Sequence, residues 1–369
     1  MLKVKNSVYA TALISSTIIG VGLFSLPYVA FKAGLWLMVG YFFFLGLIAI
    51  IIHYFFSEVA LKSPDFSRLP GLVGIHLGRK GKNIAFVSTM LGLLGAILAY
   101  LIVGGQFLSF LLSPFFGGSN LLYTLIYFAF GAFLIYRGVK AISKIEFFCL
   151  ILIFLIVAVM VLSSYPFLET KNIPLIGEKG HLFLPYGVIL FSLWGASVIP
   201  EAEEILGRKK ELLKKVIPIS IIIPILIYIL FIFFILGIQG ENVTPSALGG
   251  LKNLLDKRIY FLSLLFGILA TFTSFIALGL TLKKVFWYDL KIDKNASWLI
   301  TCFVPLSLFL IGFKDFIEII GLVGGIAIGI DAVLISLMYK RIKPKNILVY
   351  PLVLVFLAGI IYEIIYFIK

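Results

Sequence analysis

Two short stretches decide the fold of this chain: Ile19-Gly20-Val21-Gly22-Leu23-Phe24-Ser25-Leu26-Pro27 and Leu193-Trp194-Gly195-Ala196-Ser197-Val198-Ile199-Pro200. Each lies inside a long apolar run and places a glycine five residues before a proline. Glycine and proline both weaken a helix, so each stretch is expected to interrupt one. Gly22 and Gly195 are 173 positions apart, and so are Pro27 and Pro200, which predicts two copies of one structural unit.

The composition of the 369-residue chain places these stretches in a membrane. Apolar residues make up 62% of the chain and charged residues 13%, whereas a typical soluble domain has about 45–50% and about 25%. A water-soluble core of this size cannot bury that much apolar surface. We therefore expect an integral membrane protein and exclude a soluble enzyme, a nucleic-acid-binding protein and a disordered scaffold.

Apolar runs long enough to cross a bilayer alternate with charged or Gly/Pro-rich breaks. A spanning helix needs about 20 residues, because the bilayer core is about 30 Å thick and each residue adds about 1.5 Å. The runs are continuously apolar, which indicates helices and not the alternating strands of a barrel. The eleven predicted spans are 9–30, 35–61, 84–112, 121–136, 146–164, 183–206, 216–238, 259–286, 297–311, 315–339 and 346–368.

The offset of 173 residues also maps the other spans of the first half onto those of the second. The short span 121–136 maps to 294–309, close to the equally short span 297–311. Five spans are an odd number, so the second copy enters the membrane from the opposite side and the repeat is inverted. The predicted divisions are 1–165 for the first five-helix repeat, 166–182 for an extracellular linker, 183–340 for the second repeat and 341–369 for an additional C-terminal helix.

Lys and Arg residues predict the orientation. Most of the 31 lie in segments on the same side of the membrane as the N-terminus, and cytoplasmic loops carry an excess of these residues. We therefore expect a multi-pass plasma-membrane protein with a cytoplasmic N-terminus and an extracellular C-terminus. The net charge of +14 is then a signal of topology and not of an anionic partner.

The two breaks also carry a family resemblance. Gly20 to Pro27, followed by Tyr28 and Ala33-Gly34, resembles the first helix of amino acid/auxin permeases. Pro200-Glu201-Ala202-Glu203-Glu204, with Lys210 and Leu212 after it, resembles the sixth-helix signature of the amino acid–polyamine–organocation (APC) transporter superfamily. The resemblance covers spans one to ten. It implies an all-α membrane protein with the leucine-transporter (LeuT) fold, in which a 5+5 inverted repeat with broken helices 1 and 6 surrounds an amino acid site, here with an eleventh helix added.

The breaks themselves predict an amino acid site. Backbone groups at a break lose their helical partners, and the N-terminus of a half-helix attracts an anion. The N–H groups of residues 20–23 suit a carboxylate, and the carbonyls around residues 191–194 suit an ammonium group. Aromatic side chains from spans three, six and eight favour a neutral apolar or aromatic substrate. The predicted substrate-binding residues are Gly20, Val21, Gly22, Leu23, Phe24, Tyr100, Phe191, Ser192, Trp194, Gly195 and Phe272.

Neighbouring hydroxyls at Thr273 and Ser274 in the eighth span offer hard oxygen ligands for a small cation. The family fold has a sodium site between the eighth span and the end of the first half-helix. The resemblance therefore implies a sodium site made of these two hydroxyls and the carbonyls of Ser16, Ile19 and Ala270. The alternative is that the hydroxyls bond to carbonyls of their own helix.

The proton is the alternative coupling ion. Some proton-coupled relatives have a lysine in the fifth helix, but the matching position here falls near Ile153, which disfavours a proton at that place. His53 and Asp331 lie within spans, where ionisable groups are by default functional, and are the candidates for a proton relay. For His53, the alternative is a neutral imidazole held by hydrogen bonds.

These features predict a secondary active transporter that imports a neutral L-amino acid by alternating access and sodium symport, with the proton as the alternative ion. An ATP-driven pump is disfavoured because no GxxxxGK[ST] loop occurs, and an enzyme because no HExxH or Ser/His/Asp set occurs. A channel and a non-transporting amino acid sensor stay open as rival functions. The expected partners are the amino acid and the lipid bilayer, without nucleic acid, and the chain is expected to function as a monomer.

Overall fold

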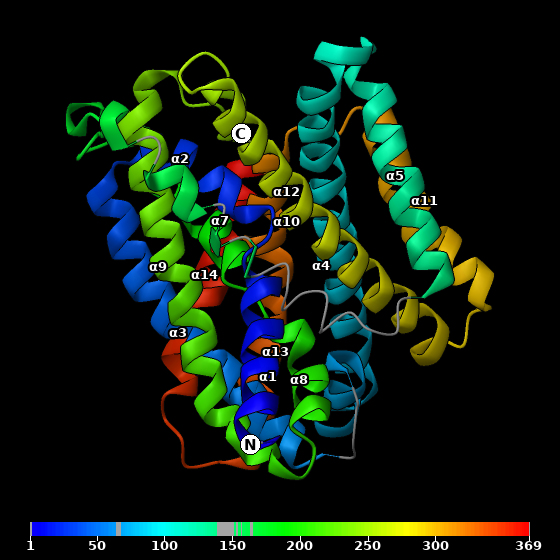
Figure 1. Ribbon diagram of the computed structural model, residues 1–369. Helices are drawn as coiled ribbons and strands as arrows, with labels where there is room; N and C mark the ends of the chain where they lie inside the picture. Colours follow the sequence, from blue (N-terminus) through cyan, green and yellow to red (C-terminus); the bar gives the residue numbers. More distant parts are fainter. Residues whose placement is uncertain are drawn as a thin grey trace.

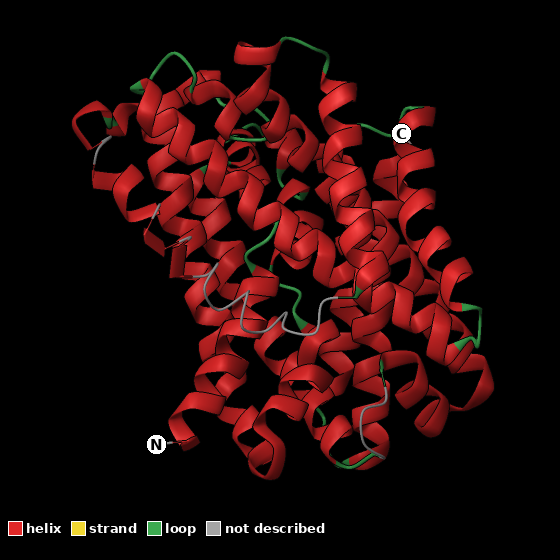
Figure 2. Cartoon of the chain, turned by 45° about the vertical axis from the view of Figure 1, so that its right-hand side comes forward, coloured by secondary structure: helices red, strands yellow, loops and turns green. Residues whose placement is uncertain are grey.

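The computed structural model describes residues 2–63, 68–138, 151–152, 154–155, 157–162 and 165–368. Helices connected by short loops make up this part of the chain, which contains no β-strand (Figures 1 and 2). The α-helices are α1 (Leu2–Ile18), α2 (Gly22–Ala33), α3 (Leu35–Leu61), α4 (Leu69–Phe116), α5 (Asn120–Arg137), α7 (Leu184–Ser192), α8 (Ile199–Leu206), α9 (Leu213–Gln239), α10 (Lys257–Lys284), α11 (Lys294–Ile311), α12 (Phe316–Leu322), α13 (Gly329–Ile342) and α14 (Val349–Ile368). The predicted all-α class is confirmed.

The predicted membrane spans correspond to these helices. Among the described residues, eight helical segments are long and apolar enough to cross a membrane, or nine if the bent pair Asn6–Ile18 and Gly22–Ala33 forms one span. The segment Leu184–Asn242 has 59 residues and contains both the sixth and the seventh predicted spans. The fifth predicted span, 146–164, is described only in part. A multi-pass membrane protein is thereby confirmed.

The first and sixth spans are each broken into two helices, as the sequence predicts. α1 ends at Ile18 and α2 begins at Gly22, with a bend of 51° between them. α7 ends at Ser192, and α8 begins only after the 3-10 turn η4 (Ala196–Val198). Pro200 lies in the first turn of α8, where its missing N–H costs no helical hydrogen bond.

The tenth span is more complex than its apolar pattern indicates. The π-helix η9 (Val323–Ile328) joins α12 to α13. α7 packs against η9 so closely that a Cβ on Gly324 would overlap the carbonyl oxygen of Gly187, and a Cβ on Gly187 would overlap the carbonyl oxygen of Gly321. Only glycine permits such an approach of two helix backbones.

The arrangement of the helices places both breaks in the interior of the molecule. α1 packs against α8 and α9, and α2 packs against α7 and α9. On one side, α4 packs against α5, α10 and α11. The N- and C-termini lie at opposite ends of the molecule in both views (Figures 1 and 2), as an odd number of spans requires.

Candidate substrate site at the two helix breaks

The first break leaves part of its backbone without helical partners. The Gly20 N–H donates to the Ile18 carbonyl (2.8 Å), and the Leu23 N–H donates to the Gly20 carbonyl (3.2 Å). Within the described structure, the N–H groups of Val21 and Gly22 have no such carbonyl partner. Two of the four N–H groups predicted to bind a carboxylate are therefore available, at the positive end of α2.

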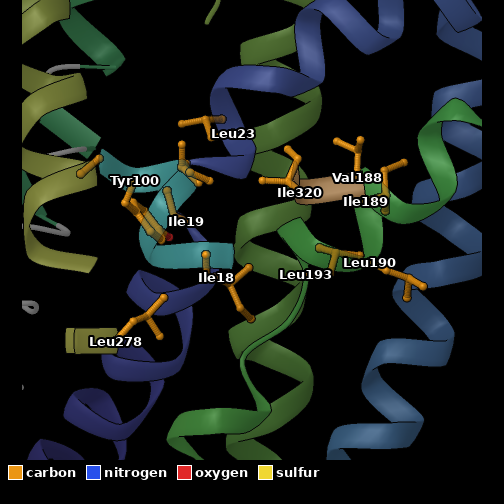
Figure 3. Close-up of a cluster of buried hydrophobic side chains, with 14 of the residues drawn as sticks. Ile18, Ile19, Leu23, Tyr100, Val188, Ile189, Leu190, Leu193, Leu278 and Ile320 are labelled. Carbon is orange, nitrogen blue, oxygen red and sulfur yellow. The ribbon is translucent and has the colours of Figure 1, made fainter. Parts of the chain in front are cut away.

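Gly20 and Gly22 lie where a side chain would not fit. A Cβ on Gly20 would overlap the hydroxyl of Tyr100 from α4, and a Cβ on Gly22 would overlap the hydroxyl of Ser192 at the end of α7. Figure 3 shows Tyr100 next to Ile19 at this break. The two glycines therefore let neighbouring helices approach the break closely.

His53 of α3 holds the second break. Its Nδ1 donates to the Ala49 carbonyl (2.7 Å), and its Nε2 accepts a hydrogen bond from the Gly195 N–H (2.9 Å). An imidazole that donates through one nitrogen and accepts through the other is neutral. The ring also lies edge-on to Trp194, with the centroids 5.3 Å apart. This is the neutral, hydrogen-bonded arrangement expected for His53 if it is not part of a proton relay, and its role in such a relay stays a prediction.

Tyr228 of α9 joins the two breaks, although sequence reasoning did not single it out. Its hydroxyl lies 2.5 Å from the Ile18 carbonyl oxygen and 2.8 Å from the Ser192 carbonyl oxygen. These carbonyls belong to the last residues of α1 and α7. The available signal was that Tyr228 carries the single polar side chain in the apolar run 221–238.

A cavity extends from the breaks toward the end of the molecule that carries the N-terminus. The volume of this cavity is about 90 Å³. Four of the predicted substrate-binding residues line it: Gly22, Tyr100, Phe191 and Trp194. Arg68, the residue before α4, also lines it, so the cavity connects the breaks with this end of α4.

Other predicted substrate-binding residues lie beside this cavity. Phe24 is fully buried, and its ring centroid lies 4.9 Å from that of Phe107, 5.5 Å from that of Phe266 and 6.1 Å from that of Phe231. We call these four rings the aromatic layer; they pack around Phe24 in the first turn of α2, next to the first break. Phe272 instead contacts Tyr127 of α5, with the centroids 5.2 Å apart, and is not among the residues that line the cavity in the described structure.

The residues of the predicted sodium site lie on α1, the first break and α10. The Thr273 hydroxyl donates to the Leu269 carbonyl (3.0 Å) and the Ser16 hydroxyl to the Leu13 carbonyl (3.1 Å), so both bond to their own helices. Ile19, Ala270 and Ser274 are buried. Leu278, one turn after Ser274 on the same face of α10, lines the cavity together with Ile18. The sodium site stays a prediction.

Asp331 of α13 lines the same cavity. Its side chain is buried and accepts a hydrogen bond from the Ser88 hydroxyl of α4. The nearby Thr89 hydroxyl is buried and has no hydrogen-bond partner in the described part of the chain. A carboxyl group that faces a cavity inside a membrane is costly to keep and by default functional. The geometry is compatible with the predicted proton relay, which stays a prediction.

Ion pairs surround the N-terminal end of the cavity. Arg68 pairs with Glu201 of α8 (3.2 Å). Glu58 at the end of α3, with a side chain only 4% exposed, pairs with Lys214 of α9 and with Lys343 after α13 (3.2 Å). The hydrogen bond to Glu58 raises the pKa of the Lys343 ammonium. These pairs tie α8, α9 and α13 to α3 and α4 at this end.

Comparison with solved structures shows which fold this arrangement represents. The chain is similar to Mhp1, a nucleobase-cation-symport-1 family transporter, in a closed conformation with bromovinylhydantoin bound. The TM-score is 0.65 at 14% sequence identity, over 89% of this chain and 77% of that chain. This similarity confirms the predicted LeuT fold. The described helices, with the first and sixth spans broken, therefore have the arrangement of this membrane-protein fold.

The family is shown by the sequence itself. Residues 3–364 match the model of the tryptophan/tyrosine permease family, and the chain belongs to this family. No curated protein sequence matches the chain. The expectation of a transporter and not an enzyme is confirmed, whereas the resemblance to amino acid/auxin permeases in particular stays a prediction.

Proposed function

We propose that the chain imports a neutral aromatic or apolar L-amino acid, with tryptophan and tyrosine as the first candidates, by alternating access. The observation that carries this proposal is that both breaks meet at one cavity. The N–H groups of Val21 and Gly22 lie at the positive end of α2, which suits the substrate carboxylate. The negative end of α7 at Ser192 suits its ammonium group. Tyr100, Phe191 and Trp194 line the same cavity and suit an aromatic side chain.

The same geometry supports a conformational assignment. The cavity reaches Arg68 at the N-terminal end of the molecule, while the aromatic layer closes the opposite side of the first break. With the N-terminus in the cytoplasm and the C-terminus outside, as the distribution of Lys and Arg favours, this conformation opens toward the cytoplasm. We further propose that a monomer in the plasma membrane is the functional unit.

Two coupling ions are supported by different observations. Sodium symport is supported by the Thr273-Ser274 pair on α10, of which Ser274 lies one turn before the cavity-lining Leu278 on the same face. Proton coupling is the second candidate, because the Asp331 carboxyl group lines the cavity and is buried.

Transport tests the proposal directly. Purified protein in proteoliposomes should accumulate labelled tryptophan or tyrosine against a concentration gradient when an inward sodium or proton gradient is imposed. A channel would only equilibrate the substrate, and a sensor would bind it without uptake. Binding without accumulation under either gradient would contradict the proposal.

Substrate affinity identifies the ion. If sodium binds at Thr273 and Ser274, the affinity for substrate should rise with sodium concentration when choline replaces sodium at fixed ionic strength. Bound substrate should in turn raise the affinity for sodium by the same factor. Replacing both residues by alanine should remove that dependence and leave weaker substrate binding. Equal affinities in sodium and choline, together with a pH dependence that Asp331→Asn removes, would instead support the proton.

A further inference from the structure

Glu363 lies in α14, the helix that follows the inverted repeat. It is the single charged residue of Val349–Ile368 and is only 7% exposed. A carboxyl group buried in a membrane helix is costly, and such groups mark ion or proton pathways by default. Neither the predicted substrate site nor the predicted sodium site uses this residue.

The carboxyl group of Glu363 lies against two glycines. A Cβ on Gly187 of α7 would come within 2.6 Å of its Oε1, and a Cβ on Gly325 of η9 would overlap its Cγ. Gly187 lies in the first turn of α7, so the start of this half-helix packs directly against the Glu363 side chain. Glu363 therefore contacts α7, whose far end forms the second break, and η9, on which α7 rests.

Glu363 also lines a second cavity, at the end of the molecule opposite the N-terminus. The volume of this second cavity is about 580 Å³. Most other charged groups there are engaged, since Lys32 and His181 pair with Glu178, and Asp315 caps α12. The titratable groups around Glu363 are Tyr28 and Lys32 of α2, His181 of η3 (Lys179–His181), Asp315 and Glu318 at the start of α12, Tyr362 and Tyr366 of α14, Tyr186 of α7 and Tyr41 of α3.

Tyr186 supplies a second, independent observation. Its hydroxyl is buried and has no hydrogen-bond partner among the described residues. A Cβ on Gly359, one turn before Glu363 in α14, would overlap this hydroxyl. The Tyr186 hydroxyl is thus a buried polar atom without a protein partner, on the helix face that packs one turn from the Glu363 carboxyl group, and it is available to a bound cation or water molecule.

We propose that Glu363 is the group that takes up the coupling cation, a proton or sodium, from the outer cavity. The proposal rests on the proposed function as a secondary transporter. Cation binding neutralises the carboxylate at the contact of α14 with α7 and η9, and thereby acts on the half-helix that leads into the second break. Asp331 follows Gly325 by six residues, roughly 9 Å along a helix, and lines the inner cavity. The tenth span thus carries Asp331 on the inner cavity and contacts Glu363 on the outer cavity.

Two transport modes test this role. In proteoliposomes, Glu363→Gln should retain exchange of labelled tryptophan for unlabelled tryptophan within about twofold, because exchange needs no net cation movement. Uptake driven by an imposed gradient should fall by at least about tenfold. Separate pH and sodium gradients show which cation Glu363 takes up. The matched control is Glu318→Gln, an exposed carboxylate on the same cavity, which should retain both modes.

Gradient-driven uptake by Glu363→Gln at the wild-type level would overturn the proposal. So would loss of exchange and driven uptake together in a variant with the wild-type melting temperature, because Glu363 would then support substrate binding and not coupling. Failure of the wild-type protein to transport either amino acid would instead count against the proposed function.

A measurement on the wild-type protein covers the case in which the variant does not fold. A hydrophobic carbodiimide modifies buried protonated carboxyl groups, and mass spectrometry of the α14 peptide reports the modified fraction of Glu363. Modification should fall severalfold with added sodium if sodium binds, or with rising pH if the proton binds. Modification that is insensitive to both would contradict the proposal.

Discussion

The two breaks have the same Gly-x4-Pro spacing, but different contacts stabilise their non-helical backbone. At the first break, Gly20 and Gly22 remove side chains, and Tyr100 and Ser192 occupy the space. At the second, the Gly195 N–H is held by the His53 imidazole. An inverted repeat therefore repeats the position of an interruption and not the contacts that maintain it. Close packing of Tyr100 and Ser192 against glycines distinguishes the first break, and the hydrogen bond to His53 distinguishes the second, whereas Tyr228 bonds to carbonyls at both.

The largest effect is expected at the first break. Gly22→Val would place a β-branched side chain against the Ser192 hydroxyl and within 3.0 Å of its Cα, next to the N–H groups proposed to bind the carboxylate. Affinity for tryptophan, measured by isothermal titration calorimetry, should fall by roughly 100-fold or more. Gly40→Val is the matched control, because a Cβ at Gly40 meets no atom within 4 Å. Wild-type affinity in folded Gly22→Val protein would refute the assigned site.

The second break should respond to loss of its hydrogen-bond acceptor. His53→Leu leaves the buried Gly195 N–H unpaired, at a cost of about 1–3 kcal/mol, so substrate binding should weaken by about 5- to 150-fold if the break must keep its shape to bind. His53→Gln keeps an acceptor oxygen and should lose less. If the leucine variant binds substrate as tightly as the wild type, His53 does not hold this break.

Tyr228→Phe acts on both breaks at once. It removes the hydroxyl shared by the Ile18 and Ser192 carbonyls, at a cost of about 1 kcal/mol, or about fivefold in affinity. A double-mutant cycle with His53→Leu should show a coupling energy, because both residues act on the second break. Strict additivity of the two changes would show that they act independently.

The smallest effect is expected for Ser192→Ala. The Ser192 hydroxyl donates to the Val188 carbonyl of its own helix (2.7 Å), so its loss should change affinity by no more than about twofold. Ser192→Gly should also partly restore binding in Gly22→Ala, because it removes the atoms that the new methyl group would meet. Absence of such a rescue would show that the first break is not limited by this contact.

Features that depend on local sequence were predicted well. The spans follow from the length of the apolar runs, and the breaks from glycine and proline within them. The contact of Gly187 with Gly324 and the π-helix η9 were not predicted, because they depend on which faces of distant spans meet. The same dependence on packing explains why the rings of Phe24 and Phe272 lie outside the cavity, although phenylalanine suits an aromatic binding site.

Part of the site was also within reach of the sequence. Gly22, Tyr100, Phe191 and Trp194 line the cavity because residues next to a break face the space that it opens. Tyr228 was missed because an isolated tyrosine in an apolar helix is usually a packing residue. Its role depends on two carbonyls, one from each repeat, that meet only in the folded protein.

The aromatic layer has an energetic consequence for the proposed transport cycle. Each contact of the Phe24 ring contributes about 0.5–1.5 kcal/mol beyond its burial, so its three contacts with Phe107, Phe266 and Phe231 contribute a few kcal/mol in all. If the proposed outward-facing conformation separates these rings, the contacts favour the conformation described here by that amount. A difference of that size keeps an alternative conformer at about 0.1–10% of the population. Under the proposed alternating access, the layer would set how rarely the empty protein faces outward. Trimming one ring would then change that resting population without altering the groups proposed to recognise the substrate.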